Sequence, residues 1–295
     1  MTTELDIIIP VYNDQEGLNK ILSSVENQNA SKELIRVLVV DNDSSPAIQI
    51  PPTSFEVHLL HCDQAGSYAA RNTALTKVQS KIVAFTDADC ILDRNWVKTG
   101  IQNINITSKQ LSKPVILAGE ISIIPSKQPE TSADLADIHF GMTQKKFVNR
   151  GRYGITANLW ARSEDLVLLS GFNESLKSGG DRDFCLRAQQ QLNANLIYDP
   201  DCIVYHPARS KKEQIIKSKR LLGGQFDRAK GNHVKEIAAL FLHLRPLIKE
   251  TLESLMIPVS AKRRLKLMFF VYQVRFSTIS EWMKLFLRKK KSSRL

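Results

Sequence analysis

The fold is decided by the stretch Ile82-Val83-Ala84-Phe85-Thr86-Asp87-Ala88-Asp89-Cys90, an apolar run that ends in two carboxylates. Such a run is typical of a buried strand in a parallel sheet, and ligands of open α/β sheets bind beyond the carboxyl ends of the strands. In extended backbone Asp87 and Asp89 point to the same side, where a divalent cation between them would relieve their repulsion. Two interpretations are open: a metal site, or a strand end in which Asp87 or Asp89 caps the next helix.

The composition is that of an ordinary globular protein of 295 residues, with 43% hydrophobic and 24% charged residues. The four cysteines have neither CxxC pairing nor metal-ligand spacing, which indicates reduced, mostly buried thiols. The N-terminal residues lack the pattern of a signal peptide, and no window approaches 18 uninterrupted apolar residues. We therefore expect a cytoplasmic protein.

The net charge of +11 is unevenly distributed. Residues 209–295 hold 22 Lys and Arg against 6 Asp and Glu, which leaves 19 basic and 24 acidic residues for 1–208. This asymmetry predicts a mildly acidic domain followed by a basic extension with a task of its own. We place the boundary between a catalytic domain, residues 1–225, and a basic helical extension, residues 226–295.

Apolar runs alternate with segments of helical spacing, which predicts a doubly wound, mostly parallel α/β sheet with helices on both faces. Pro10 is expected to end the first strand. A single helix is expected around 135–147. The expected strands are 5–12, 34–40, 55–60, 81–85, 115–124, 156–161, and a last pair at 196–198 and 202–207. The ends of three of these strands place Tyr12, Asp41 and Asp87 along one edge.

Six motifs and a closing histidine follow one another along the chain: Pro10-Val11-Tyr12-Asn13, Val40-Asp41-Asn42-Asp43-Ser44, Ala70-Arg71-Asn72, Asp87-Ala88-Asp89, Gly171-Phe172-Asn173-Glu174, Gly180-Asp181-Arg182-Asp183 and His206. Each motif alone is weak, but their order and spacing are specific. Over about residues 4–225 the chain resembles the family 2 glycosyltransferases of GT-A fold. The resemblance implies inverting transfer of a sugar from a nucleotide-diphosphate sugar, with UDP-sugars favoured, to a saccharide or lipid-linked acceptor.

The resemblance implies a divalent metal, Mn²⁺ or Mg²⁺, held by Asp89 with His206 as a second ligand, and Asp87 on the sugar-nucleotide side. Hard cations of this kind bind through one or two carboxylates together with substrate phosphates, and Mn²⁺ also accepts an imidazole. The alternative for His206 is a histidine buried at a strand end.

The resemblance also implies a donor site in which Asp41 contacts the nucleobase and Arg71 lies near the diphosphate. A carboxylate can accept an imide N–H, and arginine binds phosphate in a bidentate manner. The alternatives are that Asp41 is a turn residue and that Arg71 is an exposed helix arginine. The remaining predicted donor-binding residues are Pro10, Val11, Tyr12, Ser44, Asp87 and Ala88.

An inverting transfer needs a general base beside the acceptor hydroxyl, and the motif at 179–183 matches the family's Gly-Glu-Asp-x-Asp pattern. We assign the base to Asp181, with Asp183 as a substitute or acceptor contact. Gly180 stands where the family has Glu, which puts acceptor binding in doubt. The alternative is that these aspartates cap a helix. Trp160 is considered for the acceptor face, although such an aromatic is more often in the core.

Basic clusters and apolar stretches alternate between 209 and 295, as in helices that bind an anionic membrane surface. The chain would then lie on the inner face of the membrane. The alternative is a solvated helical tail that packs on the catalytic domain; no motif supports nucleic-acid binding, and we expect none. Two other functions stay open: an inactive nucleotide-sugar-binding scaffold, suggested by Gly180, and a sugar-phosphate nucleotidyltransferase, which lacks its glycine-rich loop here.

Overall fold

A computed structural model describes residues 3–229 and 247–287 of the chain. These residues form two compact units, each described by itself below. Unit 1 comprises 1–122, 143–175 and 180–206, and unit 2 comprises 123–142, 176–179 and 207–295. Helix α8, Lys211–Ala229, runs across the predicted domain boundary after residue 225. The assignment of catalysis to 1–225 stays a prediction, but no compact unit ends at that residue.

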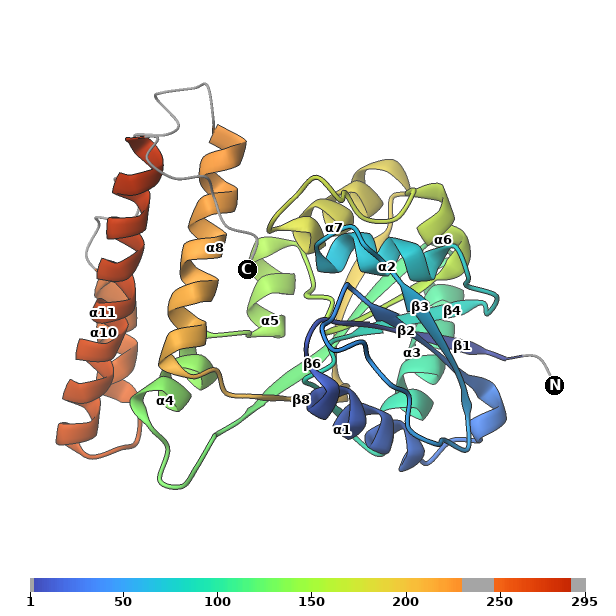
Figure 1. The fold of residues 1–295 in the computed structure, drawn as a ribbon, viewed down its shortest axis with the longest axis horizontal. Coiled ribbons are helices and arrows are strands. Elements are labelled where there is room, and N and C mark those ends of the chain that lie inside the picture. The colour runs from blue at the N-terminus through green and yellow to red at the C-terminus, as the bar shows by residue number, and fades with distance from the viewer. Residues whose placement is uncertain (1–2, 230–246, 288–295) are drawn as a thin grey trace. The chain divides into compact units, whose positions relative to one another are not determined.

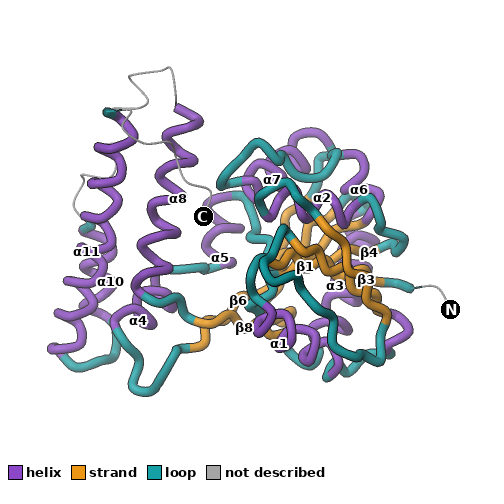
Figure 2. The backbone as a smooth tube through the Cα atoms, viewed as in Figure 1, coloured by secondary structure: helices purple, strands orange, loops and turns teal. Residues whose placement is uncertain are grey.

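The described residues contain one eight-stranded sheet in the order β3-β2-β1-β4-β7-β6-β8-β5 (Figure 1; Figure 2). Its strands are β1 (Leu5–Val11), β2 (Ile35–Asp41), β3 (Glu56–His61), β4 (Ile82–Thr86), β5 (Ile91–Leu92), β6 (Val115–Ile124), β7 (Asn158–Arg162) and β8 (Asn195–Pro207). The four strands β3, β2, β1 and β4 are parallel, whereas β7 is antiparallel to both β4 and β6. The sheet is therefore mixed, with its parallel part built from the first 86 residues.

Three expectations about these elements are wrong. Pro10 does not end β1 but lies inside it and pairs with Val40 of β2. The pairing of β1 with β4 ends earlier, at Ile8, so at Pro10 the strand pairs with β2. The expected strand pair at 196–207 is the single strand β8. The expected helix at 135–147 is divided into α4 (Ser132–Phe140) and α5 (Gln144–Lys146), and α5 continues into a π-helical turn, Phe147–Gly151.

Helices cover both faces of the sheet in unit 1 (Figure 1). On one face lie α2 (Ser67–Leu75), α6 (Ser163–Leu168) and α7 (Gly180–Gln191), whose alanines and Phe184 pack on the parallel strands. On the other lie α1 (Gln15–Glu26) and α3 (Trp96–Leu111). Trp160 is fully buried there against Trp96, with ring centroids 4.4 Å apart. Its proposed place on an acceptor face is therefore wrong.

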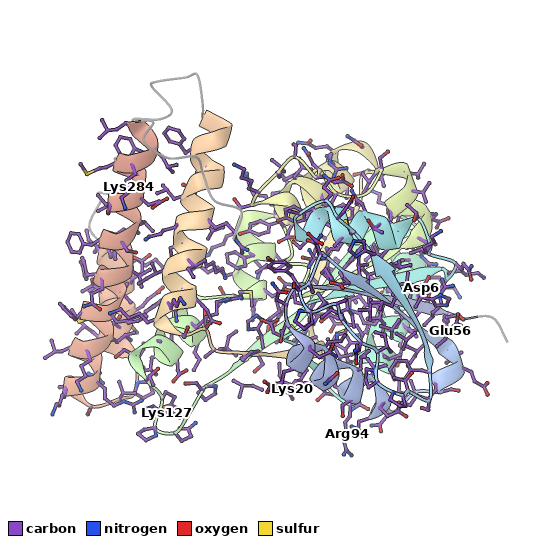
Figure 3. All side chains as sticks on the ribbon, in the orientation of Figure 1. Asp6, Lys20, Glu56, Arg94, Lys127 and Lys284 are labelled. Atoms are coloured by element: carbon purple, nitrogen blue, oxygen red, sulfur yellow. The ribbon has the colours of Figure 1, made fainter. Side chains whose placement is uncertain are left out.

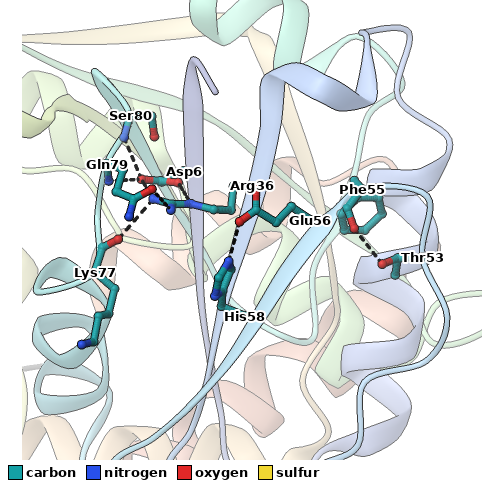
Figure 4. Close-up of polar contacts among 9 residues, drawn as sticks. All are labelled: Asp6, Arg36, Thr53, Phe55, Glu56, His58, Lys77, Gln79 and Ser80. Atoms are coloured by element: carbon teal, nitrogen blue, oxygen red, sulfur yellow. Dashed lines mark hydrogen bonds and ion pairs between the residues drawn. The ribbon is translucent and has the colours of Figure 1, made fainter. Parts of the chain in front are cut away.

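A buried ion pair joins the amino-terminal ends of β1 and β2 (Figure 4). Nε and Nη2 of Arg36 donate to the two carboxylate oxygens of Asp6 at 2.7 and 2.8 Å, and the backbone N–H groups of Gln79 and Ser80 also donate to Asp6. Neither side chain is more than 3% exposed. The neighbouring Glu56, labelled with Asp6 in Figure 3, lies at the surface. Asp6 thus fastens the loop before β4 to the first two strands.

Unit 2 is helical and contains α4, α8, α10 (Ile248–Met256) and α11 (Ala261–Phe286). Its core joins Leu135 and Ala136 of α4 to Leu267 and Phe270 of α11. Arg263 forms an ion pair with Glu130 at 2.8 Å. The predicted helical extension is therefore present. Within the described ranges, no helix has the length and apolarity needed to cross a membrane.

Candidate active site

The carboxyl ends of β1, β2 and β4 meet at one edge of the sheet, as the sequence predicts. Val11 at the end of β1 is in register with Asp41 at the end of β2, and the N–H of Asn42 donates to the carbonyl of Val11 at 2.8 Å. Since β4 is parallel to β1 and ends at Thr86, the loop that begins with Asp87 leaves from the same edge. The edge therefore carries three loops from separate parts of the sequence.

Asn42 holds these loops together, a role that the sequence analysis missed. Its Nδ2 donates to the carbonyls of Cys62 and Gln64, and its Oδ1 accepts from the N–H of Gly66, each at 2.8 Å. Gly66 has φ +124°, which glycine adopts without strain, and it begins α2. Asn42 thereby fixes the start of the helix that carries Arg71.

Asp41 is buried and forms the hydrogen bonds of a turn residue, the alternative interpretation of this position. Its carboxylate accepts from the N–H of Ser44 at 2.9 Å and of Ile48 at 3.2 Å. Burial alone would raise the pKa of Asp41, but these hydrogen bonds outweigh it and hold the pKa below its ordinary value. The carboxylate stays ionised at neutral pH. Two hydrogen bonds leave lone pairs for a further donor, so the predicted base contact stays a prediction.

The first loop of the edge has one exposed aromatic side chain. Tyr12 is 53% exposed, Val11 beneath it is buried and Pro10 is partly buried. The N–H of Asn13 donates to Oγ of Ser44 at 2.9 Å, which joins this loop to the one after β2. Of the predicted wall of the base pocket, Tyr12 is therefore the side chain that can close over a ligand.

Arg71 on α2 is a buried arginine and not the exposed one of the alternative interpretation. Its Nη2 donates to Oδ1 of Asp87 at 2.5 Å, with side-chain exposures of 3% for Arg71 and 33% for Asp87. Its Nε has no hydrogen-bond partner among the described residues. A buried guanidinium with an unused donor suits an anionic ligand at this edge, because charge-assisted hydrogen bonds are the strong ones.

Asp89 lies next to His206 of β8, with Oδ2 and Nε2 3.2 Å apart. The expectation that Asp87 and Asp89 point to the same side is wrong, because β4 ends at Thr86 and residues 88–89 form a turn. The turn gives Asp87 a partner on α2 and Asp89 a partner on β8. Ala88 between them is buried.

The Asp89–His206 pair has the chemistry of a two-ligand metal site. His206 is buried and Asp89 is 43% exposed, so the carboxylate is the more accessible of the two possible ligands. Nowhere in 3–229 and 247–287 do three or more Asp, Glu, His or Cys side chains gather as a metal cluster. A cation here would need further oxygen ligands from a substrate, which is how Mg²⁺ commonly binds.

Asp181 lies in the first turn of α7 and accepts a hydrogen bond from the Thr156 hydroxyl at 3.0 Å. The preceding Gly180 N–H donates to the Tyr68 hydroxyl at 2.9 Å. A Cβ at residue 180 would lie 2.6 Å from atoms of the Tyr68 ring. The departure from the family's Glu therefore has a packing reason, and Gly180 no longer suggests an inactive scaffold.

Asp183 forms an ion pair with Arg187, one turn further along α7, at 2.8 Å. Arg187 also donates to the carbonyls of Leu169 and Gly171. Asp183 thus helps to hold the loop after α6 in place. Asp183, one of the two predicted catalytic aspartates, is therefore already paired with an arginine.

Asn72, beside Arg71, joins two of the motifs noted in the sequence. Its side-chain amide donates to the carbonyl of Phe172 and to Glu174, and accepts from the N–H of Phe172, each at 2.8 Å. These partners are about one hundred residues away in sequence. The motifs at 70–72 and 171–174 are therefore one structural connection between α2 and the segment that leads to α7.

Comparison with known proteins identifies the family of the chain. Residues 6–161 match the family model "Glycosyl transferase family 2". The glycosyltransferase AglE of Haloferax volcanii is 31% identical over 227 residues, which cover 75% of this chain and 72% of the relative. The pre-mycofactocin glycosyltransferase of Mycobacterium tuberculosis is 28% identical over 232 residues, 75% of this chain but only 46% of that relative.

Solved structures show the same fold. The crystal structure of residues 1–349 of TarS from Staphylococcus aureus superposes with a TM-score of 0.53 at 16% identity, covering 98% of this chain and 92% of that one. A mannosyltransferase from Pyrobaculum calidifontis gives 0.57 at 17% identity, covering 98% and 89%. The predicted GT-A-type α/β class is confirmed. The chain belongs to glycosyltransferase family 2.

Proposed function

We propose that this chain transfers a sugar from a nucleotide-diphosphate sugar, with UDP-sugars favoured, to a hydroxyl of a saccharide or lipid-linked acceptor. The transfer inverts the anomeric centre and uses Mn²⁺ or Mg²⁺. The observation that carries the proposal is the pair of contacts Arg71–Asp87 and Asp89–His206 on either side of the end of β4. Solved neighbours support it: TarS is known with UDP-GlcNAc, and the mannosyltransferase with GDP-Man and Mn²⁺.

The donor would lie along the carboxyl edge of β1, β2 and β4. Asp41 would accept from the base and Tyr12 would cover it, while Ser44 keeps the two loops together. Arg71 would bind a diphosphate oxygen through its unused Nε, and Asp87 holds its guanidinium in place. In this arrangement Asp41, Tyr12 and Arg71 would contact the donor, and Ser44 and Asp87 would hold the loops and the guanidinium in position.

Asp89 and His206 would hold the metal, with the diphosphate completing its coordination. When bound, the cation acts as a Lewis acid that stabilises the negative charge of the departing nucleoside diphosphate.

Asp181 would take the proton of the attacking acceptor hydroxyl. The acceptor oxygen forms a bond to the anomeric carbon from the face opposite the diphosphate, and the bond from that carbon to the phosphate oxygen breaks. The nucleoside diphosphate leaves with the bonding electrons, and the attack from the opposite face accounts for the inversion. Thr156 holds the carboxylate through its hydroxyl, because geometry is the first requirement for a general base.

Replacing Asp89 tests the metal role. Asp89→Ala should weaken Mn²⁺ binding in the presence of UDP, measured by electron paramagnetic resonance, and lower the turnover of UDP-sugar at least a hundredfold. Asp201→Ala, an exposed aspartate on β8, is the matched control and should behave as wild type. Wild-type turnover that persists in excess chelator would contradict the role of a metal.

We further propose that residues 226–295 form an extension that binds an anionic membrane surface on the cytoplasmic side. The described part of α11 exposes Leu265, Phe269 and Phe276, each about two-thirds exposed, and these apolar residues share one face of the helix. Lys284, labelled in Figure 3, adds positive charge, as do Lys262 and Lys266 of the same helix. Each lysine or arginine near anionic lipid contributes about 1 kcal/mol.

Vesicle sedimentation tests this surface. Wild type should sediment with vesicles that contain 30% phosphatidylglycerol and not with neutral vesicles, and the triple variant L265S/F269S/F276S should stay in the supernatant. V167S/L168S removes two exposed apolar residues from α6 and should leave sedimentation unchanged. A wild-type chain that sediments with neither vesicle refutes the membrane proposal and leaves the transferase proposal untouched.

A further inference from the structure

The segment Gln144–Arg152 carries positive charge that the reaction described above does not use. We name it the cationic segment. It contains Lys145, Lys146, Arg150 and Arg152, all exposed, and no acidic residue. Lys145, Arg150 and Arg152 form no ion pair with any carboxylate in the described ranges. Cations gathered without acidic partners raise the local concentration of anions.

The cationic segment has a rigid base. Gln144 is fully buried; its side chain donates to the carbonyl of Asn158 at 3.0 Å and accepts from the N–H of Ile155 at 2.8 Å. The π-helical turn Phe147–Gly151 follows, a rare geometry that occurs frequently at functional sites. Phe147 stacks on Tyr153 with ring centroids 5.1 Å apart. The charges are therefore held on a packed support.

From the cationic segment, residues 152–156 run along α7 to Asp181, the proposed general base. Arg152 contacts Gln189, the N–H of Gly154 donates to Sγ of Cys185 at 3.4 Å, and Thr156 donates to Asp181. Residues 152, 154 and 156 thus contact α7 at three positions, each one helical turn closer to the N-terminus of α7 than the one before. The eight residues between Gln189 and Asp181 correspond to about 12 Å along a helix axis.

Tyr153 lies on the same path. Burial raises the pKa of its hydroxyl, and the charge of Asp181 raises it further while that of Arg182 lowers it. Tyr153, which stacks on Phe147, is thus close enough to Asp181 and Arg182 to interact electrostatically with both. The cationic segment and Asp181 lie on one continuous strip of unit 1.

We infer that the acceptor is an anionic saccharide or alditol chain that carries phosphate, and that the cationic segment binds a phosphate about 12 Å along α7 from the hydroxyl that is glycosylated. This inference rests on the proposed transferase function and names its acceptor class. Arginine and lysine both bind phosphate, arginine in bidentate geometry. A neutral acceptor would leave Lys145, Arg150 and Arg152 without an anionic partner in the described ranges.

The test measures binding of a fluorescent, phosphodiester-linked ribitol oligomer by anisotropy, with the donor site saturated by UDP and Mn²⁺. Wild type should bind this oligomer, with affinity that falls as salt is added, and should bind maltohexaose at least tenfold more weakly. K145Q/R150Q should weaken oligomer binding tenfold or more and reduce its dependence on salt. K98Q/K109Q removes two exposed charges from α3 and should bind as wild type does.

Three results would overturn the inference: unchanged oligomer binding by K145Q/R150Q, equal binding of maltohexaose, or no oligomer binding by wild type. Loss of vesicle binding in K145Q/R150Q would assign the cations to lipid head groups and would also overturn it. Slow release of UDP from UDP-sugar without acceptor reports separately on the transferase proposal. That release should be the same in wild type and K145Q/R150Q, and its absence from wild type would count against the transferase alone.

Discussion

Asp181→Asn should lower the rate of sugar transfer by 10²- to 10⁴-fold, the range that a general base contributes. Asparagine has nearly the same shape and can still accept from the Thr156 hydroxyl, as the carboxylate does at 3.0 Å, but it cannot take the acceptor's proton. The dissociation constant of UDP, measured calorimetrically with Mn²⁺, should therefore stay within about twofold of wild type.

Asp183→Asn is the matched comparison, because it changes the neighbouring carboxylate of the same helix turn. Loss of its ion pair with Arg187 should loosen the loop after α6 and lower thermal stability more than the catalytic rate per folded molecule. Equal loss of UDP binding and transfer in Asp181→Asn would make Asp181 a structural residue. Transfer at the wild-type rate would remove it from the mechanism.

Asp6→Ala should lower the free energy of unfolding by about 3–5 kcal/mol, the usual effect of removing one partner from a buried ion pair. The alanine leaves the Arg36 guanidinium buried without its carboxylate and frees the N–H groups of Gln79 and Ser80. Denaturation in urea, followed by circular dichroism, measures the change. Glu56→Ala breaks the exposed Glu56–His58 contact beside it and should cost less than about 1 kcal/mol.

The same pair predicts how stability depends on pH. Burial would raise the pKa of Asp6, but the hydrogen bonds from Arg36 and the neighbouring backbone prevail and lower it from 3.8. The unfolded chain therefore binds this proton more readily than the folded one. The contribution of Asp6 is present above the unfolded-state pKa of 3.8 and is lost as the pH falls through the lowered folded-state pKa. Asp6→Leu combined with Arg36→Met should remove this acid sensitivity at little cost in stability; a double variant as unstable as Asp6→Ala would show that the charge pair is itself required.

The parallel half of the sheet could be predicted because its strands are continuous apolar runs. All seven residues of β2 and all five of β4 are buried, so the sequence pattern and the packing agree. The common edge for Tyr12, Asp41 and Asp87 followed from the parallel arrangement alone. The partners of these residues did not follow, because hydrogen bonding after a strand end depends on the turn that the chain makes there.

The missed features all rest on contacts between distant segments. Asn42 and Asn72 look like ordinary loop and helix residues, yet their amides join segments 20 to 102 residues away. The turn at 88–89 has no glycine or proline to indicate it. The π-helical turn at 147–151 begins at the last residue of the helix predicted at 135–147. Local sequence patterns indicate secondary-structure propensity, and propensity does not determine any of these features.

The packing of Tyr68 on Gly180 limits the order in which this site can evolve or be redesigned. Introducing the family's Glu at 180 first would drive a Cβ into the tyrosine ring, while shortening Tyr68 first would take the hydrogen-bond acceptor from the Gly180 N–H. Each single step is therefore expected to destabilise the fold. Laboratory libraries that vary position 180 alone should therefore return few folded transferases, whereas libraries that vary 68 and 180 together can reach the other solution.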